Sequence, residues 1–196
     1  TRLNIINRVQ RLLQFNTDYF LHDENGNYIR NEEGEIIDAG KFINLVAHDK
    51  VYQDPSLALP SVENAAPAYA GLCSMLADDN SPTNEYVDGG GLPYTYSKPQ
   101  ANKLVGNKFV VFKRKDNRPC VVSGTNCAQR RSGWTRFLTM DIVFNLVEDL
   151  RNIYDKYIGK GNTLERRNAL NSDIRKELDE RETLVDADYN LIMDRT

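Results

Sequence analysis

Apolar side chains return every three or four positions at the start of the chain. Leu3, Ile6, Val9 and Leu13 follow this spacing, and mostly polar residues fill the positions between them. The period matches the 3.6 residues of a helical turn, so residues 3–13 are predicted to form an amphipathic helix. The chain opens on Thr1 without an initiator methionine, and we expect it to be a fragment of a longer protein.

Short apolar runs alternate with turn residues between positions 19 and 38. The runs at residues 19–21, 27–30 and 35–37 are separated by Asn25-Gly26 and Glu33-Gly34, pairs that favour tight turns. This pattern predicts a β-meander. Its many carboxylates predict that the meander is exposed.

Asp23, Asn25 and Asn27 alternate like the first ligands of a calcium-binding loop. In such a loop, glycine occupies the sixth position and a bidentate glutamate the twelfth. Here the glycine stands at the fourth position, and no glutamate stands at the twelfth. We therefore interpret the segment as an exposed acidic hairpin, and we predict no bound metal.

A short strand and a helix of unusually small residues are predicted next. The apolar run at residues 42–46 is typical of a strand covered on both faces, and residues 52–60, with two prolines, are expected to form an extended linker. Asn64 then caps a helix with Pro67 in its first turn, and turn formers at residues 78–82 follow it. The small side chains allow another backbone to approach closely; they are Ala65, Ala66, Ala68, Ala70, Gly71, Ser74 and Ala77.

Two β-rich runs form the clearest predicted hairpin. They occupy residues 109–112 and 120–122, and a polar turn at residues 113–119 joins them. A short helix that starts near Ser97 precedes the first run. The cations along the hairpin are typical of a sheet edge protected against pairing with another chain; they are Lys113, Arg114, Lys115 and Arg118.

Two helices and a strand are predicted for the last third of the chain. Residues 137–158 carry a broad apolar face, which suits a helix packed in an α/β layer or between subunits. Asn162 and Glu165 have the spacing of a capping box before a final helix at residues 163–182. That helix has only a narrow apolar stripe, so most of its surface is expected to face solvent or a polar partner. Residues 189–193 are predicted to start a strand.

Charge is unevenly distributed, although the net charge is only −3. Residues 18–38 hold seven acids and one base, a local charge of −6, whereas residues 108–136 hold eight bases and one acid, a local charge of +7. These segments are either solvated surfaces or opposite poles, which would suit head-to-tail docking of copies or a charged partner. A nucleic-acid-binding module, or another non-enzymatic assembly module, that uses residues 108–136 is the alternative interpretation. The acidic overall balance and the absence of aromatic residues interleaved with these bases oppose it.

The chain shows no pattern of catalytic or metal-binding residues. Its three cysteines include no Cys-x-x-Cys pair, which argues against a zinc site and a disulfide framework and favours a reducing compartment. His48 and Asp49 are adjacent, so their side chains point to opposite sides of a strand and cannot form a relay. The glycines at 89–91 lack the flanking elements of a phosphate-binding loop. We predict that the chain is not an enzyme, binds no cofactor and does not cross a membrane.

Several motifs follow one another from Lys41 to Tyr189. They are a small-residue helix, an Asp-x-x-x-Pro-Thr-Asn turn, a strand pair, a long helix and a Gly-x-Gly-Asn-Thr turn before the last helix. In this order and spacing they resemble the C-terminal half of contractile tail sheath proteins, which build the sheaths of contractile-tailed phages and related injection machines. The resemblance implies an α/β (α+β) fold. In it, a mixed sheet is packed by the long helix, the small-residue helix and the C-terminal helix, and the acidic meander is an insertion.

The resemblance also implies a domain division at residue 40. Residues 1–40 would form a helix and the acidic meander, within or inserted into a sheath domain, and residues 41–196 would form a sheath C-terminal-type domain. Sheath proteins usually continue into a C-terminal extension that adds a strand to a neighbour's sheet.

As a sheath protein, the chain would be a structural subunit of a bacteriophage virion or of a contractile injection system. It would be assembled in the host cytoplasm, polymerise helically around an inner tail tube and contract to drive that tube through the host envelope. Its partners would be neighbouring sheath subunits, the tube protein, and baseplate and tail terminator proteins. Contacts with the tube are expected from Arg166, Arg167, Arg175 and Lys176. Contacts between subunits are expected from Lys113, Arg114, Lys115, Arg118, Arg130 and Arg131.

Overall fold

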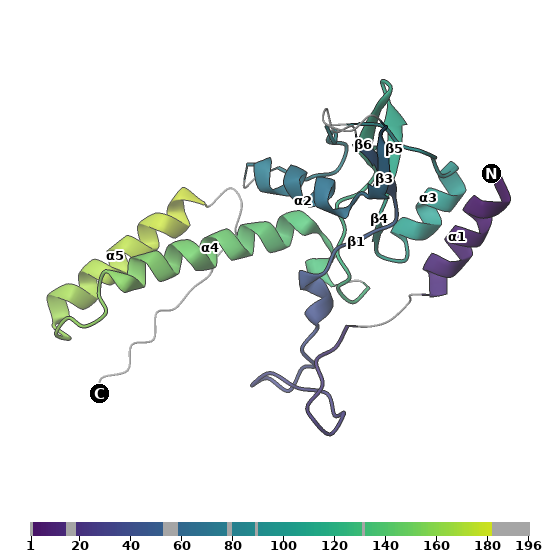
Figure 1. Ribbon diagram of the computed structural model, residues 1–196. Helices are drawn as coiled ribbons and strands as arrows, with labels where there is room; N and C mark the ends of the chain where they lie inside the picture. Colours follow the sequence, from purple (N-terminus) through teal and green to yellow (C-terminus); the bar gives the residue numbers. More distant parts are fainter. Residues whose placement is uncertain are drawn as a thin grey trace. The chain divides into compact units, whose positions relative to one another are not determined.

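The computed structural model describes residues 2–14, 19–52, 59–77, 80–88, 90–130 and 132–181 (Figure 1). The chain forms two compact units, Thr1–Met140 and Asp141–Thr196, which we call unit 1 and unit 2. The boundary between the units falls inside a helix. The domain division at residue 40 stays a prediction.

Three short strand pairs form the centre of unit 1. β1 runs parallel to β4, whereas β2 pairs with β3 and β5 with β6 in antiparallel fashion. Only two residues separate β1 from β2, and only one separates β4 from β5. The mixed α/β class is therefore confirmed, with the sheet divided into short pairs. The bounds are β1 Leu45–Val46, β2 Asp49–Tyr52, β3 Ser61–Asn64, β4 Phe109–Val110, β5 Phe112–Lys115 and β6 Arg118–Val121.

The predicted hairpin is present as β5 and β6. Asp116 and Asn117 form its turn, and both have positive φ values, of 48° and 60°. Asp and Asn tolerate this conformation better than other non-glycine residues, and turns of this kind match the twist of the flanking strands. Residues 84–88 extend along the other side of β6, where Tyr86 bridges to Cys120. Arg118, the cation of β6, therefore stands on a strand that has a neighbour on both sides.

α1 (Arg2–Gln14) and α3 (Lys98–Val105) cover one side of the strands, and the amphipathic helix predicted at residues 3–13 is confirmed. The N–H and the hydroxyl of Ser97 both donate to Oε1 of Gln100 at 2.9 Å, which fixes the start of α3. The apolar cluster under these helices has as buried members Val9, Ala47, Tyr96, Ala101, Leu104, Phe109 and Val111.

α2 (Ala66–Met75) is the predicted small-residue helix. Ala65 occupies the position that we assigned to Asn64 as the cap, but the side-chain oxygen of Asn64 still accepts the N–H of Ala66 at 2.8 Å. The helix anchors a second apolar cluster through Tyr69. The buried members of this cluster are Ala65, Tyr69, Val87, Leu92, Val110, Phe112 and Val121.

Two predicted segments differ in the structure. The strand predicted at residues 42–46 is shorter in the structure, because the 3-10 helix η1 (Ala39–Phe42) occupies its first position. The side chain of Phe42 is 54% exposed, whereas a strand covered on both faces would have buried it. The Asp38 carboxylate stabilises η1 by accepting the N–H of Gly40 at 2.8 Å. The predicted linker begins later than residue 52, because Tyr52 pairs with Ser61 at the ends of β2 and β3. Residues 53–58 lie outside the described residues.

α4 (Phe137–Asp155) begins in unit 1 and continues into unit 2, where α5 (Leu164–Glu180) lies beside it (Figure 1). Ile153, Leu170 and Ile174 are buried between the two helices. The hydroxyl of Thr163 accepts the N–H of Arg166 at 3.3 Å, so Thr163 caps α5 in place of the predicted Asn162. The strand predicted at residues 189–193 lies outside the described residues.

Candidate assembly surfaces

The first candidate surface is formed by residues 19–39, which we call the acidic module. A ring of three backbone hydrogen bonds closes it: Leu21 donates to Ile37, Ile37 to Ile29, and Ile29 to Leu21, at 2.9–3.0 Å. The predicted meander is therefore present, with its three runs in mutual contact. The isolated β-bridges of the module are Phe20–Asp38, His22–Tyr28 and Arg30–Ile36.

The acidic module contains an eight-residue repeat that the spacing of its apolar runs did not reveal. Residues 23–30 read Asp-Glu-Asn-Gly-Asn-Tyr-Ile-Arg, and residues 31–38 read Asn-Glu-Glu-Gly-Glu-Ile-Ile-Asp. Gly26 and Gly34 occupy the same position of the repeat, and both have a φ of 82°, which favours glycine. The repeat could have been found in the sequence by aligning the chain with itself at a shift of eight residues.

The first residue of each repeat fixes its turn. Oδ1 of Asp23 accepts the N–H groups of Asn25 and Asn27 at 2.9 and 2.8 Å, and Oδ1 of Asn31 accepts the N–H groups two and four residues later at 3.1 and 2.8 Å. Hydrogen bonds from Asn27 are the main cause of the lowered pKa of Asp23. A neutral amide serves as well as a carboxylate here, so the turns need an acceptor and not a metal ion. This agrees with the hairpin interpretation.

The second candidate surface is one face of the β5–β6 hairpin, which carries Lys113, Lys115 and Arg118 and which we call the basic face. Lys113 and Lys115 are two residues apart, so their side chains leave the strand on the same side, and Lys115 lies opposite Arg118. Both Lys115 and Arg118 lie over the ring of Tyr86, at 5.4 and 4.7 Å from its centre. The Tyr86 hydroxyl donates to the Asp116 carboxylate at 2.6 Å and so holds the ring in place.

Other cations of the basic segment bond to the chain itself. Arg114 donates to the carbonyl of Leu92 at 3.0 Å, and Arg130 donates to the side chain of Asn107 at 3.3 Å. Lys108 donates to the carbonyl of Cys127 at 3.2 Å. Within the basic face, Lys113 donates to the side chain of Asn84 at 2.7 Å, and Arg118 pairs with Asp88. Most of these bases therefore already bond to the chain itself, which weakens the nucleic-acid interpretation. Arg131 lies outside the described residues, and the role of the whole set in subunit contacts stays a prediction.

The four cations predicted to face the inner tube do not share one face of α5. Arg166 and Arg175 are nine residues apart, about two and a half turns, so they point to opposite sides of the helix. Arg166 donates to the carbonyl of Gly161 at 3.0 Å. Arg175 and Lys176 instead line an open polar groove along α5. The tube-facing role of all four, Arg167 included, stays a prediction.

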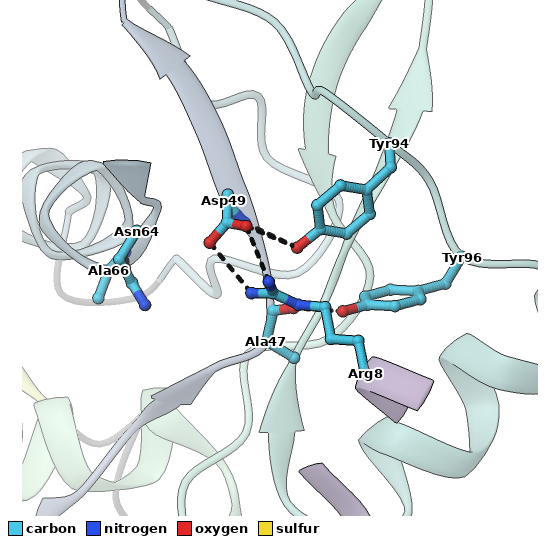
Figure 2. A network of polar contacts seen from close by, with 7 residues as sticks. All are labelled: Arg8, Ala47, Asp49, Asn64, Ala66, Tyr94 and Tyr96. Atoms are coloured by element: carbon cyan, nitrogen blue, oxygen red, sulfur yellow. Dashed lines mark hydrogen bonds and ion pairs between the residues drawn. The ribbon is translucent and has the colours of Figure 1, made fainter. Parts of the chain in front are cut away.

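A polar network holds α1 against the strands of unit 1 (Figure 2). The Arg8 guanidinium donates to both carboxylate oxygens of Asp49, at 3.0 and 2.9 Å, and lies 5.2 Å from the centre of the Tyr94 ring. The Tyr94 hydroxyl bonds Asp49, and the Tyr96 hydroxyl donates to the carbonyl of Ala47 at 2.6 Å. Because both members of the ion pair are partly buried, it is stronger than an exposed pair. No local sequence pattern connects residue 8 with residue 49.

His48 acts as a structural hydrogen-bond acceptor. Its ring is fully buried and stacks on Tyr94 and Phe112, at 5.3 and 5.7 Å between ring centres. Nδ1 accepts the N–H of Phe112 at 3.1 Å. His48 lies between the end of β1 and the start of β2, so its ring takes the place that a backbone carbonyl would have in a continuous strand. Burial, helped by the positive charge of Arg8, lowers the pKa of His48 to about 3. The ring is therefore neutral at pH 7, as its acceptor role requires.

The described residues contain no arrangement suited to metal chemistry: within them, no three His, Cys, Asp or Glu side chains gather around one point. Cys120 and Cys127 are buried, and burial raises the pKa of the Cys127 thiol, which disfavours the reactive thiolate. A cleft of about 720 Å³ lies between the acidic module and η2 (Gly133–Thr135). There the Lys41 ammonium lies 5.1 Å from the Trp134 ring centre, and no nucleophile and base are paired among the residues that line the cleft.

The fold of the chain matches solved structures from contractile systems. A chain in the cryo-EM structure of the anti-feeding prophage baseplate aligns with 69% of this chain at a TM-score of 0.57 and 14% identity. The helical sheath of the anti-feeding prophage in its contracted state aligns with 69% at 0.54 and 13% identity. The sheath tail protein from Desulfitobacterium hafniense aligns with 72% at 0.57 and 18% identity. This chain has the fold of a contractile sheath protein.

The resemblance found in the sequence is thus confirmed as a likeness of contractile sheath fold over about 70% of the chain. The chain spans 34–39% of the length of these three structures, so each match concerns one part of a longer protein. No model of a protein family matches the sequence, and no curated protein matches it. Among the described helices, none combines the length and the apolar composition of a membrane-spanning segment.

Proposed function

We propose that this chain is part of the structural subunit of a contractile tail sheath, which polymerises around an inner tube and contracts to drive the tube through a host envelope. The observation that carries the proposal is the match in fold to the anti-feeding prophage sheath, a helical assembly in its contracted state. The match to the Desulfitobacterium hafniense sheath tail protein supports it. The work of the chain is then mechanical, and it converts no substrate.

Copies of the same chain are the first partners under this proposal. Identical subunits that join through two different surfaces form a helical array when the rotation does not close into a ring. The inner tube protein, the baseplate and the tail terminator are further partners, within a phage virion or a related injection system assembled in the host cytoplasm. The two charged surfaces of unit 1 and the open polar groove of α5 offer places for such contacts.

The proposal is tested by the oligomeric state of the purified full chain. We expect concentration-dependent assembly into hollow rods, observed by negative-stain electron microscopy, with sedimentation velocity to follow the growth. A chain that stays monomeric at every concentration reached would contradict the proposal.

Charge reversal on α5 tests the contact with the inner tube. We propose that the cations of the open groove contact acidic groups of the tube. The double variant Arg175→Glu/Lys176→Glu is then expected to weaken binding to tubes of the same system at least tenfold, because it would bring like charges together. Co-sedimentation with preformed tubes measures the binding.

The matched control for the tube experiment is Arg166→Glu/Arg167→Glu. It makes the same charge change on α5, but Arg166 points away from Arg175 and is held by Gly161. We expect this variant to retain most of the binding. Equal losses in both variants would show that overall charge, and not the groove, governs the contact.

A further inference from the structure

The acidic module exposes apolar side chains beside its carboxylates. None of the side chains at residues 19–39 is buried, so the module has no core of its own. Leu21, Tyr28 and Ile29 are 42%, 49% and 38% exposed. Leu21 and Ile29 lie on hydrogen-bonded runs, and the Tyr28 ring contacts Phe20 and His22 at 5.6 and 4.7 Å between ring centres. The backbone ring, the two repeated turns and these ring contacts fix the shape of the module. Exposed apolar side chains on a well-defined, polar-rimmed surface are typical of an interaction site.

The basic face of the β5–β6 hairpin has the opposite charge, and repulsion between its cations lowers the stability of the hairpin. Lys115 and Arg118 lie directly opposite each other, and like charges in this position destabilise a hairpin. Tyr86 lies under both cations, and Asp88 pairs with Arg118, so the structure offsets the repulsion without removing the positive surface. An edge defence does not explain Arg118, because residues 84–88 already cover that side of β6.

The two surfaces complement each other in charge. The acidic module holds six acids and one base, a net charge of −5, and the hairpin from residue 112 to 121 holds four bases and one acid, a net charge of +3. In Figure 1 the turns of the module and the β5–β6 hairpin lie at opposite ends of unit 1, so one chain does not bring its own two surfaces together.

We propose that the acidic module of one copy docks on the basic face of the next copy, as one of the contacts that build the assembly. This inference rests on the proposed function. The contact is heterologous, because the two surfaces differ, and each copy offers both of them. Repetition of such a contact propagates in one direction and does not stop at a dimer.

A pair of charge-swapped variants of the full chain tests the contact. The first carries Glu24→Lys, Glu32→Lys and Glu33→Lys, which spare Asp23, Asn31 and the two glycines that hold the turns. The second carries Lys113→Glu, Lys115→Glu and Arg118→Glu. We expect each variant alone to need at least a tenfold higher concentration to assemble than the unmodified chain, because its two surfaces then have the same sign. Sedimentation velocity at low and high salt measures this.

The mixture of the two variants is the decisive measurement. In an equimolar mixture the basic module of the first variant meets the acidic hairpin of the second, and the reverse pair also has opposite signs, so assembly is expected to return. The first variant alone, added in small amounts to the unmodified chain, is expected to cap growth, since its hairpin still binds an acidic module while its own module does not.

Matched controls reverse the same number of exposed charges elsewhere. They are Glu63→Lys/Glu148→Lys/Glu165→Lys and Lys98→Glu/Lys103→Glu/Arg151→Glu, and both are expected to assemble like the unmodified chain. If the swapped variants assemble normally on their own, or if the mixture fails to assemble, the docking inference is wrong while the sheath proposal stands. If the unmodified chain does not assemble at all, both are wrong.

Discussion

Replacement of His48 with alanine is expected to lower the free energy of unfolding by about 3–5 kcal/mol. The substitution leaves a cavity among the rings of Tyr94, Tyr96 and Phe112. It also leaves the buried N–H of Phe112 without its acceptor. A loss of this size is a large fraction of the stability of an ordinary domain. Urea denaturation followed by circular dichroism measures it.

His48→Asn separates the two contributions. The Oδ1 of asparagine stands at the same number of bonds from the backbone as the Nδ1 of histidine, so it can accept the N–H of Phe112 while the ring is lost. We expect it to recover about 1 kcal/mol relative to alanine, the usual net contribution of a hydrogen bond. If the two variants are equally stable, the ring's packing alone accounts for the role of His48.

The same histidine makes the stability of unit 1 depend on pH. Its pKa is about 3 in the folded chain and about 6.5 in the unfolded chain, so between these values the unfolded state binds the proton. The stabilisation is complete above pH 6.5 and declines as the pH falls toward 3. Between pH 7 and pH 5 the loss is about 2 kcal/mol. A His48→Asn chain measured at both pH values should lack this part of the change.

Replacement of Gly40 with alanine is expected to destabilise the chain by about 3 kcal/mol. A β-carbon at this position would overlap the backbone carbonyl of Cys127, with its carbonyl carbon at 2.7 Å, and no side-chain rotation relieves a backbone overlap. The N–H of Cys127 donates to the carbonyl of Ile43 at 2.9 Å, so a shift would also disturb the start of β1. Thermal unfolding of the variant measures the effect.

Gly71→Ala is the matched control for Gly40→Ala. Gly71 lies on the exposed side of α2, and a β-carbon there meets no atom within 4 Å. Alanine is the better helix former, so this variant is expected to gain about 0.5–1 kcal/mol. If both glycine variants are destabilised alike, the overlap at Cys127 does not explain the effect at Gly40.

The helices and the hairpin could be predicted from the sequence because their signals are local. The period of Ile6 and Val9 in α1 and the apolar faces of α4 and α5 are contained within each segment. The turn at Asp116 and Asn117 was likewise visible between two β-rich runs.

Three of the features that were missed depend on residues far apart in the chain. The hydrogen bond from Phe112 to His48 spans 64 positions, and the ion pair of Arg8 with Asp49 spans 41. The 3-10 helix replaced part of a predicted strand because Gly40 packs on the Cys127 carbonyl, which no local pattern announces.

The sequence predicted which segments carry an excess of charge, but it did not predict which of their side chains share one side of a strand or helix. The count over residues 108–136 grouped Arg114 and Lys108 with Lys113 and Lys115. In the structure, Arg114 leaves β5 on the other side from Lys113 and Lys115 and donates to the carbonyl of Leu92. Lys108 precedes the hairpin and donates to the carbonyl of Cys127. On α5, the helical period alone would have shown that Arg166 and Arg175 point to opposite sides, so this part of the prediction could have been sharper.

The two matching turns of the acidic module also bear on how this region changes in evolution. Each turn closes through bonds within its own eight residues, with Asp23 or Asn31 at the start and a glycine at the fourth position. Gain of eight codons by unequal recombination would add one complete turn with its own acceptor and glycine, whereas loss of eight codons would also remove one of the three runs that close the backbone ring. Related genes would then differ in the length of the acidic module by multiples of eight residues, without changes in the rest of unit 1.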